Sequence, residues 1–166
     1  MISKKILSVI TSVMVFCCVV GVSLTNVKAD DSAPKSVDGS YLTSADSSTG
    51  YTPKNNERGK HLMDGQCSIS KTGTKRIYAY GSTTANHTVD TVAVIVYVDQ
   101  YNEKDDEWYQ IDAFSKKVEN DYYSATSKSI QVERGYYYRV HADHFVRMGE
   151  QPAEETFSVT NGILVP

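Results

Sequence analysis

A valine-rich run near the middle of the chain constrains its fold most. Residues 89–101 read VDTVAVIVYVDQY, and within them residues 92–98 place four valines on one parity and Ala93, Ile95 and Tyr97 on the other. Successive side chains of a strand point to opposite faces, so this run is apolar on both. Such a strand is typical of the middle of a sheet that is covered on both sides.

A short polar connection after this run predicts a hairpin. Residues 102–107 read NEKDDE and lead into residues 108–118, WYQIDAFSKKV, in which apolar and polar side chains alternate in part. Two β-rich runs joined in this way are the pattern of two antiparallel neighbours. We expect residues 119–121 to turn the chain again.

The N-terminus has the features of a targeting segment. Lysines precede an apolar run over residues 6–24, and Val27 and Ala29 are small residues at the minus-three and minus-one positions of a cleavage site. We therefore expect residues 1–29 to be a signal peptide, the protein to be secreted and extracellular, and the mature chain to have no membrane span. The alternative is an uncleaved anchor, because the apolar run approaches the roughly 18–20 residues that span a bilayer.

Removal of this segment leaves 137 of the 166 residues, enough for one domain with one core. Three of the 17 basic residues leave with it, so 14 remain against 20 acidic ones and the formal charge is −6. An acidic chain argues against nucleic acid as a partner, since that binding requires a basic face. Cys67 is the one cysteine left, so the domain has no internal disulfide, which fits export by a Gram-positive bacterium.

Composition divides the mature chain into two parts. Residues 30–61 are rich in Ser, Thr, Asp, Asn and Gly and contain few large apolar side chains. Their burial would not offset the entropy of ordering the backbone, so we expect a mobile leader, with Tyr41 and Tyr51 as side chains that could dock. Residues 62–166 then form the folded domain.

Further strand patterns follow in the domain. They are residues 62–70, residues 75–82, residues 122–132 with a bulge near 126–128, residues 136–146 and residues 156–160. In the fourth of these, Tyr136, Tyr138, Val140 and Ala142 are expected to face the core, and Tyr137, Arg139, His141 and Asp143 to face away. About seven strands, no helix and regular turn signals predict an all-β protein, an antiparallel β-sandwich of immunoglobulin-like type.

One segment carries a resemblance to known proteins. Residues 131–142, QVERGYYYRVHA, are similar to the entry into the penultimate strand of fibronectin type III and related immunoglobulin-like domains. The resemblance implies that Tyr138, or else Tyr136, bonds back to the preceding turn. The chain as a whole looks like a family of small secreted proteins of Gram-positive bacteria, which brings no activity or site with it.

Three features were considered for chemistry. His141 and His144 are three residues apart, which places them on opposite faces of a strand, so a shared metal ion would need a bulge. Cys67 lacks a Gly-rich nucleophile turn around it. The acidic residues 102–107 lack the alternating spacing and the glycine of a calcium loop. We therefore expect no catalytic residue, no metal and no cofactor.

The aromatic content points to recognition instead. The chain has 12 tyrosines and one tryptophan, more than the core of one small domain can enclose. Exposed aromatic side chains beside polar groups suit the binding of proteins or glycans. The candidate binding residues are Trp108, Tyr109, Tyr122, Tyr123 and Tyr137. The alternative is that tyrosine fills half-buried strand positions, where it is favoured.

These observations favour a secreted, non-enzymatic binding or interaction module for a protein or glycan at or outside the cell surface. One alternative is a secreted antimicrobial or toxin-like factor. Another is a hydrolase, which would require a pocket that gathers Cys67 or a histidine with an acid.

Overall fold

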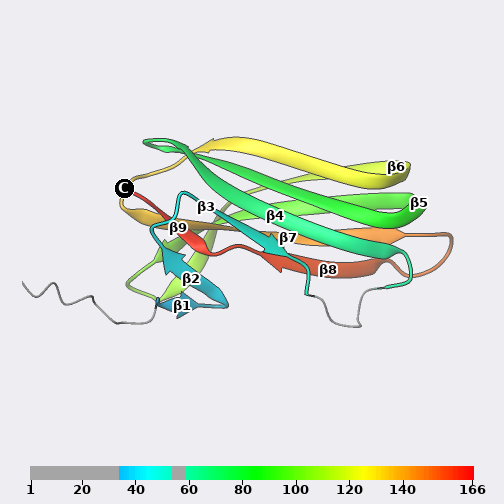
Figure 1. The fold of residues 1–166 in the computed structure, drawn as a ribbon, viewed down its shortest axis with the longest axis horizontal. Coiled ribbons are helices and arrows are strands. Elements are labelled where there is room, and N and C mark those ends of the chain that lie inside the picture. The colour runs from blue at the N-terminus through cyan, green and yellow to red at the C-terminus, as the bar shows by residue number, and fades with distance from the viewer. Residues whose placement is uncertain (1–33, 54–58) are drawn as a thin grey trace, which may run out of the picture. The chain divides into compact units, whose positions relative to one another are not determined.

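The computed structural model describes residues 34–53 and 59–166, which contain nine strands and no helix (Figure 1). The predicted signal peptide lies outside the described residues. The strands are β1 (Ser36–Val37), β2 (Ser40–Thr43), β3 (Ser47–Tyr51), β4 (Leu62–Gly73), β5 (Arg76–Asn102), β6 (Glu107–Gln131), β7 (Tyr136–Arg147), β8 (Glu154–Val159) and β9 (Gly162–Val165). The all-β class is therefore confirmed, with nine strands where about seven were expected.

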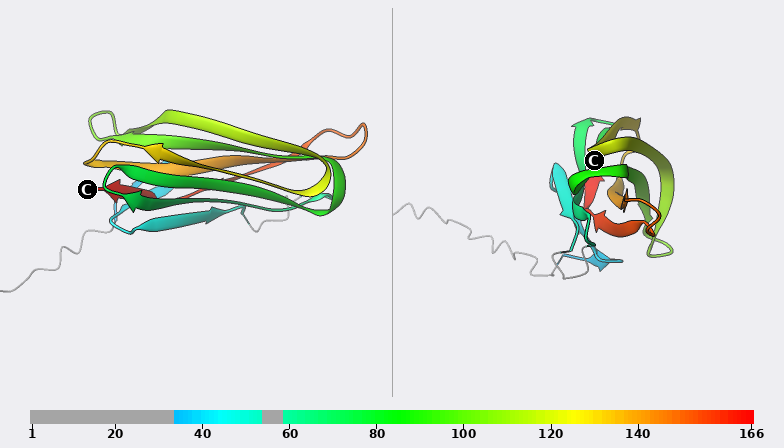
Figure 2. Two further views of the ribbon diagram at one scale, coloured as in Figure 1. Left: turned by 90° about the horizontal axis from the view of Figure 1, so that it is seen from above. Right: turned by 90° about the vertical axis from the view of Figure 1, so that its right-hand side faces the viewer.

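The strands join into one sheet rather than two. Their order is β1-β2-β9-β7-β5-β4-β3, with β6 beside β5 and β8 beside β7. The sheet curls into a half-barrel, so that strands far apart in this order face one another (Figure 2). The expectation of antiparallel pairs alone is wrong, because β2 and β9 are parallel, with Leu42 opposite Gly162.

The predicted hairpin is confirmed, but it is much longer than expected. β5 has 27 residues and β6 has 25, and they pair along nearly their whole length. The turn expected at residues 119–121 is instead part of the continuous strand β6. The first half of β5 has β4 as its second neighbour, and the last half has β7, so one hairpin runs through the whole sheet.

A bend divides the hairpin into two arms. Thr84 pairs with Tyr123, and the next pair is Val89 with Asp121, so five residue steps of β5 match two of β6. An odd number of extra residues moves the following side chains of β5 to the other face of the strand. The bulge expected near residues 126–128 is wrong, because the pairing there is unbroken.

The concave face of the curled sheet holds the core. All four valines of residues 92–98 are completely buried, as predicted, and Cys67 and Ile69 of β4 face them. The opposite side of the valine run is only half-buried, so the expectation of cover on both faces is wrong. The two arms pack closely: a Cβ added at Gly81 would lie 2.5 Å from Cγ2 of Val96.

The polar stretch expected to be a mobile leader contains three strands instead. Residues 36–51 hold β1, β2 and β3, and they belong to the same compact unit as the rest of residues 33–166. These strands attach through main-chain pairing and small side chains: Ser40 Oγ donates to the carbonyl of Thr160 at 2.8 Å, and Gly50 lies directly against the backbone of Val159. Few large apolar side chains are needed for such attachment.

β7 alternates as predicted, with two exceptions. Tyr138, Val140 and Ala142 are buried, but Tyr136 is 42% exposed at the start of the strand. Arg139 points away from the core, as expected, yet it is buried under residues 38–40. His144 is fully buried, on the same parity as Val140 and Ala142.

The hydroxyl of Tyr138 reaches the turn that precedes β7. It donates to the carbonyl of Glu133 at 3.0 Å and accepts from the amide of the same residue at 3.1 Å. The bond back to the preceding turn is therefore present, and Tyr138 rather than Tyr136 makes it.

Candidate functional site

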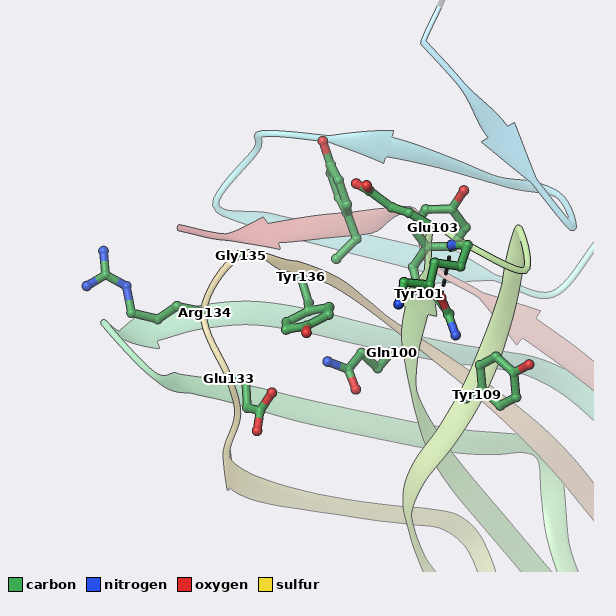
Figure 3. A pocket seen from close by; sticks show the side chains of 11 residues that line it. Gln100, Tyr101, Glu103, Tyr109, Glu133, Arg134, Gly135 and Tyr136 are labelled. Carbon is green, nitrogen blue, oxygen red and sulfur yellow. Dashed lines mark hydrogen bonds between the residues drawn. The ribbon is translucent and has the colours of Figure 1, made fainter.

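A groove of about 680 Å³ opens where the tip of the β5–β6 hairpin meets the turn between β6 and β7 (Figure 3). Tyrosine and hydrogen-bonding side chains dominate its lining. The lining residues are Gln100, Tyr101, Asn102, Glu103, Lys104, Tyr109, Glu133, Arg134, Gly135, Tyr136 and Tyr137. Its volume lies within the range of ligand sites in proteins.

The hairpin tip is stiffened by its own side chains. Asp105 accepts from the Nδ2 group of Asn102 at 2.7 Å and from the hydroxyl of Tyr109 at 3.0 Å. Asp106, whose φ is 58°, accepts from the hydroxyl of Tyr101 at 2.6 Å. Two carboxylates of the hairpin tip therefore accept internal hydrogen bonds. The bond to Asp105 holds the ring of Tyr109 at the edge of the groove.

The opposite wall is a tight turn. Gly135 has a φ of +84°, a left-handed conformation that glycine adopts without strain, and its amide donates to the carbonyl of Val165 at 2.7 Å. Arg134 donates from Nε to the carbonyl of Pro166 at 2.6 Å. The C-terminal strand thus fixes the turn that presents Tyr136.

An aromatic cluster forms the back of the groove, in which Tyr101 is buried and Trp108 and Tyr137 are half-buried. The ring of Tyr101 is 5.4 Å from that of Trp108 and 6.4 Å from that of Tyr137, between centroids. The guanidinium of Arg139 lies 4.6 Å from the centre of the Trp108 ring, and the indole N–H donates to the carbonyl of Val37 at 3.1 Å. Tyr101 packs against these neighbouring rings, which hold its side chain in place at the back of the groove.

An ion-pair network centred on Arg139 adjoins this cluster. Arg139 bonds from Nε to Asp99 at 2.9 Å and from NH2 to Asp38 at 2.8 Å, and His141 contacts Asp99 at 3.0 Å. Burial acts to raise the pKa of Asp99, but the bonds and charges of His141 and Arg139 outweigh it and hold that pKa below its ordinary value. The network ties β1 and β2 to the strands that carry the groove.

Two rings in the groove remain open to solvent. Tyr109 is 47% exposed and Tyr136 is 42% exposed. In the view of Figure 3 the side chain of Gln100 lies between these rings, and Glu133 lies below Tyr136. The hydrogen bond to the Asp105 carboxylate raises the pKa of Tyr109, so its hydroxyl stays protonated and acts as a fixed donor.

The five predicted binding residues fall in three places. Tyr109 and Tyr137 line the groove, and Trp108 lies behind it as part of the aromatic cluster. Tyr122 and Tyr123 are at the bend of the hairpin, far along β6 from the tip, where the hydroxyl of Tyr123 lies 2.8 Å from that of Tyr80. The structure therefore brings two of the five together in one opening.

Sequence reasoning missed several lining residues. Tyr136 was expected to face the core, and Gln100, Glu133 and Arg134 carried no signal of their own. The glycine before three consecutive tyrosines was a usable signal, since a turn glycine at the start of a strand leaves the first side chain at the rim of the domain.

The residues considered for catalysis lie elsewhere, in the interior. Burial raises the pKa of the Cys67 thiol to about 11 and lowers that of His144 to about 4. His144 contacts the hydroxyl of Thr83 at 2.9 Å through Nδ1 and that of Ser158 at 2.8 Å through Nε2. His141 is on the other face of β7, so the two histidines do not share a site. No group of three or more potential metal ligands occurs in residues 34–53 and 59–166.

A membrane-spanning helix, one both long and apolar enough to cross a bilayer, does not occur in the described part of the chain. No protein-family model matches the chain, and a search of curated proteins finds no match.

Proposed function

We propose that this protein is a secreted, non-enzymatic binding module that holds its ligand in the groove between the hairpin tip and the β6–β7 turn. The observation that carries the proposal is the pair of exposed rings, Tyr109 and Tyr136, fixed on opposite walls of one opening. Rigid aromatic side chains provide contact area at a small cost in conformational entropy, which makes them common at recognition surfaces.

The interior supports a binding role over catalysis. Cys67 and His144 have no exposed surface, so neither can reach a substrate, and a buried thiol with a raised pKa is a poor nucleophile. The groove itself contains carboxylates, amides and tyrosines without a nucleophile held by a base. Export, which the N-terminal sequence predicts, would place this groove at or outside the cell surface.

Retention on cell-envelope material tests the proposal. The full chain, produced in a bacterial host that exports it, is passed over cell-wall fragments, immobilised glycans and secreted proteins of a Gram-positive culture. We expect retention by at least one of them that Tyr136→Ala and Tyr109→Ala each reduce. Tyr122→Ala is the matched control, because Tyr122 is 55% exposed but lies at the bend.

The outcomes separate clearly. Retention that both groove variants lose and the control keeps supports the proposal. Retention that all four proteins share equally would move the binding surface away from the groove. Hydrolysis of any of these materials by the wild type, abolished in Tyr136→Ala, would replace the binding role with an enzymatic one.

A further inference from the structure

We propose that the ligand of this groove is an uncharged oligosaccharide. This inference rests on the proposed function and adds the chemical class of the ligand. It is carried by three properties of the groove: what its lining contains, how its charges balance, and which of its main-chain groups are already paired.

The lining is aromatic and polar, but not aliphatic. Of the eleven described residues that line the groove, four are tyrosines and none is Ala, Val, Leu, Ile, Met or Phe. Sites for apolar small molecules and for hydrophobic peptide side chains are lined mainly by such residues. A pyranose ring presents C–H groups on its faces and hydroxyls around its rim, so it can stack on a tyrosine while its hydroxyls bond to amides and carboxylates.

The groove has the rim that such a ligand needs. Tyr109 and Tyr136 offer exposed ring faces, while Gln100 and Glu133 provide planar groups with two bonding atoms each. The Nε2 group of Gln100 donates to the hydroxyl of Tyr138 at 3.2 Å, which orients its carbonyl oxygen as an acceptor. A ligand hydroxyl, which both donates and accepts, suits this mixture.

The charges of the lining cancel. Glu103 is followed by Lys104, and Glu133 by Arg134, so two acids and two bases share the groove. A site for an anionic polymer or a strongly basic peptide would carry an excess of the opposite sign. The balance favours an uncharged ligand over either of them.

A peptide strand cannot add to β7, the strand that begins with Tyr136. Tyr138 pairs with Gln100 of β5 on one side and with Ile163 of β9 on the other, and the amide of Gly135 is bonded to Val165. Extended peptides gain much of their affinity from free main-chain groups at a sheet edge. Recognition at β7 therefore depends on side chains, as saccharide binding does.

The test is a titration of the full chain, exported and purified as above, with cellotetraose and tetra-N-acetylchitotetraose, two uncharged β-linked probes with flat C–H faces. Binding is followed by calorimetry and by backbone amide shifts in NMR. We expect binding of at least one probe, with shifts that centre on Gly135, Tyr136 and Tyr109. Tyr136→Ala and Tyr109→Ala should each weaken it by about tenfold, and Tyr122→Ala should leave it unchanged. Raising the salt concentration should also leave it unchanged, since the ligand has no charge.

Failure of this inference is distinguishable from failure of the proposed function. If neither probe binds, but the groove variants still lose retention on a protein fraction, the ligand class is wrong and the binding role stands. If the chain binds negatively charged oligogalacturonate more tightly than both neutral probes, the argument from charge balance is wrong. If neither the probes nor the envelope fractions depend on Tyr109 or Tyr136, both proposals fall.

Discussion

The buried His144 predicts a stability that falls steeply in mild acid. Thr83 gives its one hydroxyl proton to the carbonyl of Ala93 at 2.8 Å, so Nδ1 of His144 donates to Thr83. In the neutral imidazole, which burial favours, Nε2 then accepts from Ser158. Burial lowers the pKa of His144 from 6.5 to about 4, and the carboxylate of Asp64 only partly opposes that shift.

The sign and size follow from the two pKa values. Above pH 6.5 the histidine is neutral in both states and has no effect. As the pH falls below 6.5 the unfolded chain binds a proton that the folded chain refuses until about pH 4, so stability is lost across this window. Between pH 7 and pH 5 the loss from this residue is about 2 kcal/mol, and it approaches roughly 3 kcal/mol at lower pH.

Urea denaturation of the full chain and of His144→Gln at pH 7 and pH 5 measures the effect. Glutamine does not titrate, so the variant should be less stable at pH 7 but should lose about 2 kcal/mol less than the wild type on going to pH 5. The other titrating groups are common to both proteins and cancel in this difference. Equal losses in the two proteins would refute the reasoning, as would an NMR titration that gives His144 an ordinary pKa.

Two further predictions concern the packing and the turn. Gly81→Ala should destabilise the protein by about 2 kcal/mol in urea denaturation, because its methyl group would press on Val96. Gly73→Ala should change the stability little, because its new Cβ would lie in ordinary contact at 3.8 Å. Equal effects of the two substitutions would contradict the close packing of the two arms. Tyr138→Phe should lower the free energy of unfolding by about 1.5 kcal/mol in the same assay, since the main chain at the β6–β7 turn loses both bonds to the hydroxyl. Tyr136→Phe should leave the stability unchanged. An unchanged stability in Tyr138→Phe would show that the turn does not need these bonds.

Strict alternation made the core predictable. The four valines of residues 92–98 and the pair Cys67 and Ile69 face the interior as their parity requires, because a two-residue period leaves few alternatives once one face is apolar. The hairpin and the bond of Tyr138 to its turn were predictable for a similar reason, since each depends on residues close together in the chain.

Features that depend on distant main-chain contacts were not predictable. β1 and β2 are short strands of two and four residues, and they are held by the pairing of β2 with β9 and by the bond of Ser40 to Thr160. The burial of Arg139 follows in part from this, since its parity points it outward and the unpredicted cover at residues 38–40, together with the Trp108 ring, removes it from solvent. The bend was not predictable, because residues 85–88 of β5, which stand opposite the single residue 122 of β6, are mostly polar.

Two of the four tyrosines that line the groove were accessible from the sequence. Tyr109 and Tyr137 were identified because tyrosine beside polar groups is typical of recognition surfaces. Their partner Tyr136 was missed because alternation assigns a face but does not show where a strand leaves the covered part of a sheet. The groove itself forms between segments about thirty residues apart, which the bend of the hairpin between Thr84 and Val89 and the pairing of β7 with β5 bring together.

The continuity of β5 and β6 has a consequence for how the protein denatures. The first half of β5 lies between β4 and β6 on one side of the core, and its last half lies between β7 and β6 on the other side. Neither side of the core can therefore detach while the other stays intact. Loss of the hairpin removes both sides at once, which requires a single cooperative transition rather than a partly opened intermediate. Mechanical pulling or mild protease should therefore find the domain either whole or wholly open.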